Sequence, residues 1–392
     1  MGLNETPASE RIHIGFFGCV NVGKSSLVNA LTGQNAALVS EEKGTTTDPV
    51  RKAMELLPLG PVMLIDTAGF EDDSSLGSIR MEKSLEVLNS IHIGILVTEA
   101  GKKINAAEQK ILALFEKRKL PYLIVCNKAD QVSTPLTGEE KMIPVSAKTG
   151  ENIGYLKERI GQLFKKEENK RLVGDLVAPL DQVVLVVPID KAAPKGRLIL
   201  PQQQTIRDLL EEGCRVSICR DAELSDLLDG LKKPPALVIT DSQVFEEVAR
   251  IVPESVPLTS FSILFARYKG SLTRMTEGAF TLENLKDHDK VLISEGCTHH
   301  RQCGDIGSEK LPAWIREFTG KEIEFTFTSG TDFQEDLGTF SLVIHCGGCM
   351  LNEKEMQYRM QKAVSAGVPV TNYGTVIAHM KGILERSLKI FG

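Results

Sequence analysis

Hydrophobic runs of strand length alternate with helical stretches along the first part of the chain. The runs are RIHIGFFG, PVMLIDTAG, IHIGILVTE, LPYLIVCNK and KMIPVSA, and hydrophobic residues at helical spacing mark KSSLVNALTG and NAAEQKILALFEKRK. This alternation is typical of βαβ units that form a mostly parallel sheet. We therefore predict an α/β domain over residues 1–170, which ends near the charged segment KKEENKR.

The same kind of pattern predicts two further α/β units. Over residues 171–268, QVVLVVPID, RVSICRD and PALVITD predict strands, and PQQQTIRDLLEEG and SQVFEEVARIV predict helices. Over residues 269–392, DKVLISEG, EIEFTFTSG and FSLVIHCGG predict strands, and KLPAWIREFTG, NEKEMQYRMQKAVSAG and GTVIAHMKGILERSLKIF predict helices. The middle unit carries no glycine-rich loop, so we interpret it as an interaction module, with dimerisation as the specific hypothesis.

The segment GCVNVGKS, from Gly18 to Ser25, matches the phosphate-loop pattern G-x-x-x-x-G-K-S. It follows a predicted strand and opens a predicted helix, which is the context that this motif requires. Lys24 is expected at the β- and γ-phosphates, and the hydroxyl of Ser25 is expected on Mg²⁺. The predicted loop residues in contact with the nucleotide are Gly18, Asn21, Val22, Gly23, Lys24, Ser25 and Ser26.

Two segments after the loop predict contacts with the magnesium ion and the γ-phosphate. In DTAG, Asp66 is the expected carboxylate near Mg²⁺, and the N–H of Gly69 is expected at the γ-phosphate. In GTTTD, Thr46 is the threonine we favour to complete Mg²⁺ coordination, although a solvated Thr-rich turn gives the same pattern. Lys24, Asn21 and Thr46 are the predicted catalytic residues.

Two later segments indicate that the bound base is guanine. In NKAD, Asp130 can accept hydrogen bonds from N1–H and the exocyclic amine of guanine, a pattern that adenine does not offer. SAK can close over the base with backbone N–H groups. The predicted base-binding residues are Asn127, Lys128, Asp130, Ser146, Ala147 and Lys148. All four motifs, in this order on one βα series, predict a GTPase that hydrolyses GTP to GDP and phosphate.

These motifs resemble the GTPases of the Era and tRNA-modification group. Residue 70, after DTAG, is Phe and not the glutamine that positions water in Ras-type enzymes, so another residue must orient the water. Asn21 resembles the asparagine that holds a potassium ion in the cation-dependent members. The resemblance implies potassium-stimulated hydrolysis, with dimerisation of the nucleotide domains as part of the stimulation. A simple turn residue is the alternative interpretation of Asn21.

Composition narrows the class of protein further. The chain has 392 residues, of which 42% are hydrophobic and 25% charged, as is ordinary for a soluble globular protein. Its 46 Lys and Arg residues against 52 Asp and Glu give a net charge of −6, so we expect no broad nucleic-acid binding. No apolar run long enough to span a membrane and no signal-peptide pattern occurs, so we expect a cytoplasmic protein with reduced cysteines and no membrane partner.

Three cysteines and two histidines follow two predicted strands of the last unit. Cys297 and His299 follow DKVLISEG, and His345, Cys346 and Cys349 end or follow FSLVIH. Ligands bind at the C-terminal ends of strands in open α/β sheets, so these side chains are expected to share one pocket. Thiolates select zinc or iron–sulfur clusters. A structural Cys₃His zinc site and a 4Fe–4S cluster with one open iron both fit the residues.

The GTPase motifs, the middle α/β unit and the Cys-x-His…His-Cys-x-x-Cys pattern together resemble the maturation GTPases of FeFe-hydrogenases, over nearly the whole chain. In that family, the cysteines that match Cys297, Cys346 and Cys349 ligate a 4Fe–4S cluster. The histidines that match His299 and His345 lie at or near it, and the middle domain dimerises. The fourth cluster ligand stays open.

The resemblance also implies the protein's cargo and partners. Members of this family act as a scaffold for the diiron precursor of the hydrogenase active site and deliver it to apo-hydrogenase. Two radical-SAM maturases supply the pieces of this precursor. How GTP hydrolysis is coupled to cluster assembly or delivery is not implied by any motif.

Two other interpretations stay open at this stage. An Era-like GTPase acting on RNA or ribosomes, with a structural zinc module at its end, uses the same motifs. The acidic balance and the absence of a basic segment with interleaved aromatic residues count against it. A redox enzyme that uses its thiols is the third interpretation, and the sequence carries no flavin or nicotinamide fingerprint for it.

Overall fold

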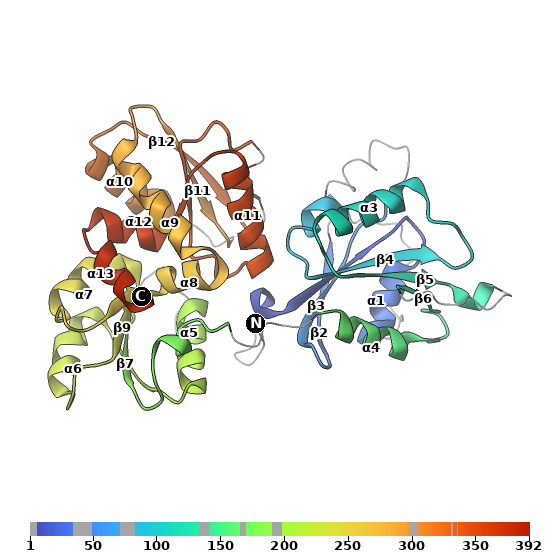
Figure 1. Ribbon diagram of the computed structural model, residues 1–392, viewed down its shortest axis with the longest axis horizontal. Coiled ribbons are helices and arrows are strands. Elements are labelled where there is room, and N and C mark those ends of the chain that lie inside the picture. The colour runs from blue at the N-terminus through green and yellow to red at the C-terminus, as the bar shows by residue number, and fades with distance from the viewer. Residues whose placement is uncertain are drawn as a thin grey trace. The chain divides into compact units, whose positions relative to one another are not determined.

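The computed structural model describes residues 6–33, 49–70, 83–132, 141–164, 170–189, 198–297, 305–330, 332–334 and 336–392. The chain divides into two compact units, Met1–Glu168 and Asn169–Gly392 (Figure 1). The division between these units lies within two residues of the boundary expected at residue 170. The boundary expected at residue 268 falls inside the second unit.

The described part of the first unit is built on a six-stranded sheet. In spatial order, its strands are β2 (Val50–Leu56), β3 (Gly60–Asp66), β1 (Ile12–Phe17), β4 (Ile93–Glu99), β5 (Tyr122–Asn127) and β6 (Met142–Pro144). All neighbouring pairs from β3 to β6 are parallel, and β2 alone runs antiparallel, against β3. Helices α1 (Lys24–Thr32) and α4 (Ile153–Leu163) pack on one face, and α3 (Ala106–Lys117) packs on the other.

The hydrophobic pattern does not predict β2. Its sequence, VRKAMEL, is mostly polar, and of its seven side chains only Leu56 is buried. The strand lies at the edge of the sheet, where side chains face water. Its pairing with all seven residues of β3 supplies the backbone hydrogen bonds that a hydrophobic pattern cannot reveal.

The second unit contains two four-stranded sheets among its described residues, and all of their strand pairs are parallel. The middle sheet has the order β10 (Leu258–Ser260), β9 (Leu237–Thr240), β7 (Gln182–Val186) and β8 (Arg215–Cys219). The C-terminal sheet has the order β12 (Glu324–Ser329), β11 (Lys290–Glu295), β13 (Leu342–His345) and β14 (Val370–Asn372). These two sheets confirm the α/β class expected for this half of the chain.

Helices lie between most of these strands in the chain order. The helices of this unit are α5 (Leu200–Glu211), α6 (Leu224–Gly230), α7 (Phe245–Ile251), α8 (Phe261–Lys269), α9 (Leu272–Ala279), α10 (Leu311–Thr319), α11 (Glu353–Ser365), α12 (Tyr373–Met380) and α13 (Leu384–Leu388). The prediction of one long C-terminal helix is wrong. Gly382 adopts a left-handed φ of 68° and donates its N–H to the carbonyl of His379, which ends α12 before α13 begins.

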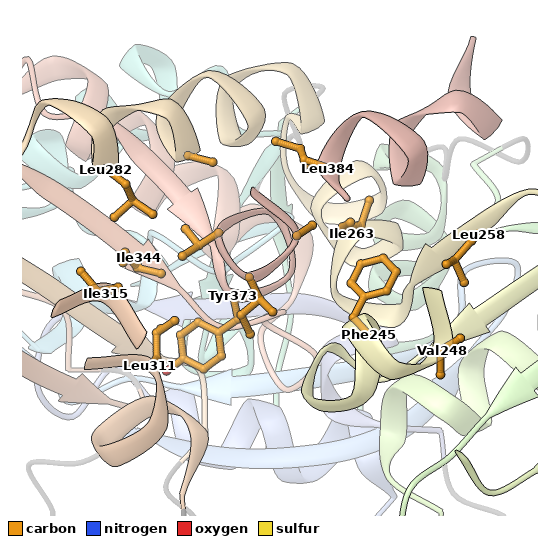
Figure 2. Packing of buried hydrophobic residues seen from close by; sticks show 14 of the residues in the cluster. Phe245, Val248, Leu258, Ile263, Leu282, Leu311, Ile315, Ile344, Tyr373 and Leu384 are labelled. Atoms are coloured by element: carbon orange, nitrogen blue, oxygen red, sulfur yellow. The ribbon is translucent and has the colours of Figure 1, made fainter. Parts of the chain in front are cut away.

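One hydrophobic cluster joins the two sheets of the second unit (Figure 2). It contains Phe245 and Leu258 beside the middle sheet and Ile315 and Ile344 beside the C-terminal sheet. Ile263 of α8 belongs to the same cluster and is fully buried. The two sheets therefore share a core, which is why they form one compact unit.

None of the helices within the described ranges combines the length and hydrophobicity that crossing a membrane requires.

Gly278 of α9 supplies a test of the packing between this helix and β14. A Cβ atom at this position would lie 2.1 Å from the carbonyl oxygen of Val370, which is backbone and cannot rotate away. We expect Gly278→Ala to destabilise the protein by about 1–3 kcal/mol because α9 must move off the strand. The measurement is the urea midpoint of the transition that reports the second unit.

Gly230→Ala is the matched control, because a Cβ at this last residue of α6 meets nothing within 4 Å. We expect it to change the free energy of unfolding by less than about 0.5 kcal/mol. Equal midpoints for the two variants would contradict the close packing of α9 on β14.

Candidate functional site

The phosphate-loop sequence joins β1 to α1, as its motif predicts, and two of its glycines are sterically required. A Cβ at Gly18 would lie 2.2 Å from the carbonyl oxygen of Val97. A Cβ at Gly23, whose φ is 91°, would lie 2.3 Å from Nδ2 of Asn127. The loop is therefore seated directly on the ends of β4 and β5, with no room for side chains beneath it.

Lys24, the first residue of α1, points back into this loop. Its Nζ donates hydrogen bonds of 2.9 Å to the carbonyl oxygens of both Gly18 and Cys19. Burial lowers the pKa of Lys24 to about 8, although the nearby Asp66 and Cys19 act in the opposite direction. The ammonium is thus held at the centre of the loop, where the oxygens of a bound phosphate would replace the carbonyls as acceptors.

Ser25 and Asp66 form a polar pair at the start of α1 and the end of β3. The hydroxyl of Ser25 donates to Oδ2 of Asp66 over 2.6 Å. Oδ1 of Asp66 is buried and has no hydrogen-bond partner within the described residues, and burial raises the pKa of this carboxyl. A hydroxyl beside a carboxylate oxygen that lacks a partner suits a hard cation such as Mg²⁺. Thr46, the third expected ligand, lies outside the described residues.

The segment after DTAG packs against the phosphate loop. A Cβ at Gly69 would lie 2.8 Å from the Cα of Val20, so the two backbones approach closely. The carbonyl of Phe70 accepts the N–H of Val20 over 3.3 Å, and the Phe70 side chain is only 1% exposed. Phe70 is therefore a core residue that cannot orient a water molecule, which agrees with the expectation that another residue does so.

Asn127 connects the predicted base site to the phosphate loop. Its Nδ2 donates to the carbonyl of Val22 over 2.9 Å, and its Oδ1 accepts the N–H of Ala147 over 3.0 Å. Ser146 donates its hydroxyl to Oδ1 of Asp130 over 2.7 Å. The NKAD and SAK segments are thus fixed to each other. Both polar atoms of the Asn127 side chain are engaged, one with the phosphate loop and one with SAK.

The three cysteines follow the two central strands of the C-terminal sheet. Cys297 follows β11, and Cys346 and Cys349 follow β13, which pairs with β11 in parallel. The N–H of Gly296 donates to Sγ of Cys346 over 3.1 Å, and the N–H of Gly348 donates to the same sulfur over 3.4 Å. The two segments that carry the thiols are therefore in direct contact.

The thiols also influence one another electrostatically. Burial raises the pKa of Cys346 to about 12, with further increases from the neighbouring thiols of Cys349 and then Cys297. In the described part of the chain, no group of three or more His, Cys, Asp or Glu side chains is arranged closely enough to hold a metal ion. His299 lies outside that part.

The residues nevertheless fit an iron–sulfur cluster in their chemistry. Cys297, Cys346 and Cys349 lie on two segments that leave adjacent strand ends, and backbone N–H groups already donate to the sulfur of Cys346, as in the hydrogen bonding that tunes such clusters. Burial raises the pKa of the Cys346 and Cys349 thiols, and the positive charge of a metal centre would compensate for this and favour the thiolates. Cys297, Cys346 and Cys349 would hold the cluster.

His345 is fully enclosed, and both of its ring nitrogens are engaged. Nη1 of Arg359 lies 3.1 Å from Nε2, and the carbonyl of Cys346 lies 2.9 Å from Nδ1. Because an arginine can only donate, Nε2 accepts and the ring proton is on Nδ1. Burial and then Arg359 lower the pKa of His345 to about 3, which keeps the ring neutral. Metal ligation by His345 would require the loss of one of these hydrogen bonds.

Arg359 was not singled out by the sequence. It lies on α11, is 1% exposed, and donates to Glu355 over 2.9 Å and to the carbonyl of Gly330 over 2.6 Å. The available signal was weak: Glu355 and Arg359 are spaced i,i+4 on a helix face that also carries Met356. On an exposed face such a pair is ordinary, so only the structure reveals that this one is buried.

Three family models match consecutive parts of the chain. The model described as 50S ribosome-binding GTPase matches residues 13–128. The model described as Hydrogen maturase F dimerization domain matches residues 172–270, and that described as Hydrogen maturase F tetramerization domain matches residues 273–390. The matches confirm the expected GTPase domain and the resemblance to hydrogenase maturation proteins.

Curated relatives are similar to part of the chain. The GTPase Der of Wolinella succinogenes is 33% identical over 179 residues, which cover 42% of this chain and 37% of that protein. The tRNA modification GTPase MnmE of Streptococcus pneumoniae is 30% identical over 246 residues, which cover 61% of this chain and 50% of that protein. The chain thus spans half or less of the length of these relatives.

The buried network around Arg359 generates a prediction on stability. We expect Arg359→Met to lower the free energy of unfolding by about 3–5 kcal/mol, because it leaves Glu355 as a largely buried charge without its cation. Denaturant unfolding of the intact chain measures this change.

Arg250→Met is the matched control, since Arg250 forms an i,i+4 pair with Glu246 on an exposed face of α7. The control should cost no more than about 1 kcal/mol. Similar losses in the two variants would show that the Arg359 network contributes nothing beyond a surface ion pair.

Proposed function

Because this chain belongs to the hydrogen maturase F family, we propose that it is a GTPase that carries the diiron precursor of the FeFe-hydrogenase active site and delivers it to apo-hydrogenase. The observation that carries the proposal is the position of Cys297, Cys346 and Cys349 on two touching segments at adjacent strand ends, in a chain that also has a phosphate loop. The two sites lie in different compact units.

The nucleotide site is proposed to bind GTP and Mg²⁺. The hydrogen bonds of Lys24 within the loop support a role at the phosphates, and the Ser25–Asp66 hydrogen bond supports a role of both residues at Mg²⁺, with Thr46 proposed as the third protein ligand. Asp130 gives guanine specificity through the oxygen that Ser146 leaves available. Lys128 lies along the base, and Ala147 and Lys148 close over it.

The cysteine site is proposed to hold a 4Fe–4S cluster through the three thiolates. Such a cluster supplies one iron with an exchangeable coordination position, which a diiron cargo could use. The hydrogen bond from Arg359 fixes the ring of His345, and we propose that His345 and His299 lie at or near the cluster. The fourth ligand is not assigned.

The proposed partners follow from the family. Two radical-SAM maturases supply the cargo, and apo-hydrogenase receives it. Residues 172–270 and 273–390 match domains named for dimerization and tetramerization, so we propose that the chain assembles through both regions, with the homodimer as the basic unit. We place this assembly in the cytoplasm.

Potassium is proposed to stimulate hydrolysis through Asn21. This residue is exposed in the phosphate loop with a left-handed φ of 63°, so its side-chain oxygen can face a bound nucleotide. The buried Phe70 leaves the water-orienting role open. We expect faster GTP turnover in potassium than in sodium at equal ionic strength, measured as phosphate release.

Asn21→Gly tests the same role, because glycine keeps the left-handed backbone and removes only the side chain. This variant should lose the difference between potassium and sodium. Asn152→Gly is the control, since Asn152 has a φ of 58° at the start of α4, outside the loop. If the unchanged protein turns over GTP at equal rates in the two salts, the potassium role of Asn21 is rejected, and its interpretation as a simple turn residue holds.

Anaerobic reconstitution tests the cluster. We expect the unchanged protein to take up about four iron and four sulfide per chain. Cys346→Ala should lose this uptake because it removes one of the three thiolates. Cys219→Ala should retain it, since Cys219 is buried at the end of β8 in the middle sheet. GTP hydrolysis should survive in both variants. Stoichiometric zinc without iron or sulfide would reject the cluster and favour the structural zinc interpretation.

A further inference from the structure

Lys269 is a buried cation that reaches from one matched domain into the next. It is the last residue of α8, which begins directly after β10 of the middle sheet. Its side chain is buried, with the residue only 2% exposed. A lysine this deep is rare unless its ammonium is bound by several acceptors, so its contacts indicate its role.

Three hydrogen bonds of the ammonium are made to one loop. Nζ donates to the carbonyl oxygens of Gly348 over 3.1 Å, Cys349 over 3.0 Å and Leu351 over 2.6 Å. An ammonium has three N–H donors, so these three carbonyls can use all of them. The carbonyls belong to the loop that carries Cys346 and Cys349, so Lys269 fixes the path of that loop from outside the C-terminal sheet.

Two further observations place the side chain of Lys269 and the path of α8 beside this loop. Nζ of Lys269 also lies 5.2 Å from the ring centre of Phe265, one turn earlier on the helix. A Cβ at Gly347 would lie 3.6 Å from the hydroxyl of Ser262, also on α8. The start of α8 therefore runs close to the loop at Gly347, and Lys269 at its end provides the directional contacts.

We propose that Lys269 is a positioning residue of the cysteine site, which holds the Cys346–Leu351 loop in its binding conformation and raises the reduction potential of the cluster bound there. The inference rests on the proposed 4Fe–4S function of Cys297, Cys346 and Cys349. The proposal thus gives Lys269, at the end of the helix that follows β10 of the middle sheet, a role in a site of the C-terminal sheet.

The electrostatic part follows from charge and burial. A cluster core of charge +2 with three thiolates carries a net charge of −1, and one added electron makes it −2. A buried ammonium stabilises the second state more than the first, because Coulomb attraction is weakly screened in the interior.

The test compares Lys269→Met, Lys269→Arg and a matched control in the full-length protein. Arg386→Met is the control, because Arg386 is also a buried cation on three carbonyls, those of Ala249, Val252 and Pro253 at the end of α7. After anaerobic reconstitution, iron and sulfide are counted. The one-electron midpoint potential of the cluster is then measured by reductive titration with dithionite as the electron donor, with the reduced cluster monitored by electron paramagnetic resonance.

We expect Lys269→Met to shift the midpoint potential to more negative values, and Lys269→Arg to return it toward that of the unchanged protein. Arg386→Met should leave the potential unchanged, even though its loss of stability is comparable. If Lys269→Met loses the cluster while Lys269→Arg and Arg386→Met keep it, the positioning role is supported directly.

Three results would overturn the proposal. The first is an unshifted potential and full cluster content in Lys269→Met. The second is a Lys269→Arg variant that behaves like Lys269→Met. The third is an equal loss of cluster in all three variants, which would mean that Lys269 acts only through stability. If the unchanged protein takes up no iron or sulfide, the proposed function itself is rejected. If the unchanged protein binds a cluster but the midpoint potential of Lys269→Met is not shifted, only the role of the lysine is rejected.

Discussion

Both candidate sites depend on one constraint, the alignment of parallel strand ends. In a parallel sheet, all C-terminal ends meet at one edge, so residues far apart in sequence are brought together there. The phosphate loop leaves β1, Asp66 ends β3 and Asn127 ends β5. In the second unit, β11 and β13 place Cys297 near Cys346 in the same way. The loops supply the functional side chains, and the order of the strands in the sheet determines which of these side chains lie close together.

The sequence predicts the parts of the molecule whose signals are local. Strands buried on both faces, such as β1 and β5, appear as continuous hydrophobic runs, and the phosphate loop has a fixed spacing around Lys24. The strands β10 and β14 are missed because two of the three residues in each, LTS and VTN, are polar, whereas the equally short β6, MIP, is apolar and is predicted. The helix α8 is also missed: FSILFARYK is short and almost entirely buried, so it lacks a polar face.

The supporting residues of the cysteine site could not be found from sequence for a different reason. Lys269 acts on carbonyl oxygens 79 or more residues away, and backbone acceptors leave no trace in residue types. Arg359 lies on a helix whose pattern was recognised, yet its pairing with His345 depends on which face is buried. In contrast, the cysteines are recognisable because their ligand chemistry requires those residue types at short spacing.

The shared core of the second unit sets a limit on how the chain can be divided. The two matched family domains meet between residues 270 and 273, but Ile263 of α8 packs in the same cluster as Ile344 of β13 (Figure 2). A fragment cut at this junction would expose one side of that cluster to water and would lose Lys269 as well. The matched boundaries therefore describe units of sequence similarity, whereas we expect cooperative folding to follow the continuous core.

The position of Lys24 has a consequence for the energetics of nucleotide binding. With a pKa near 8 in the nucleotide-free loop, part of the population has a neutral amine in mildly alkaline solution. Phosphate oxygens favour the ammonium, so binding at such pH draws a proton from the buffer. The measured heat of binding then contains the ionisation heat of the buffer, and the apparent affinity declines as the solution becomes more alkaline. The loop that recognises phosphate is in this way also a proton acceptor.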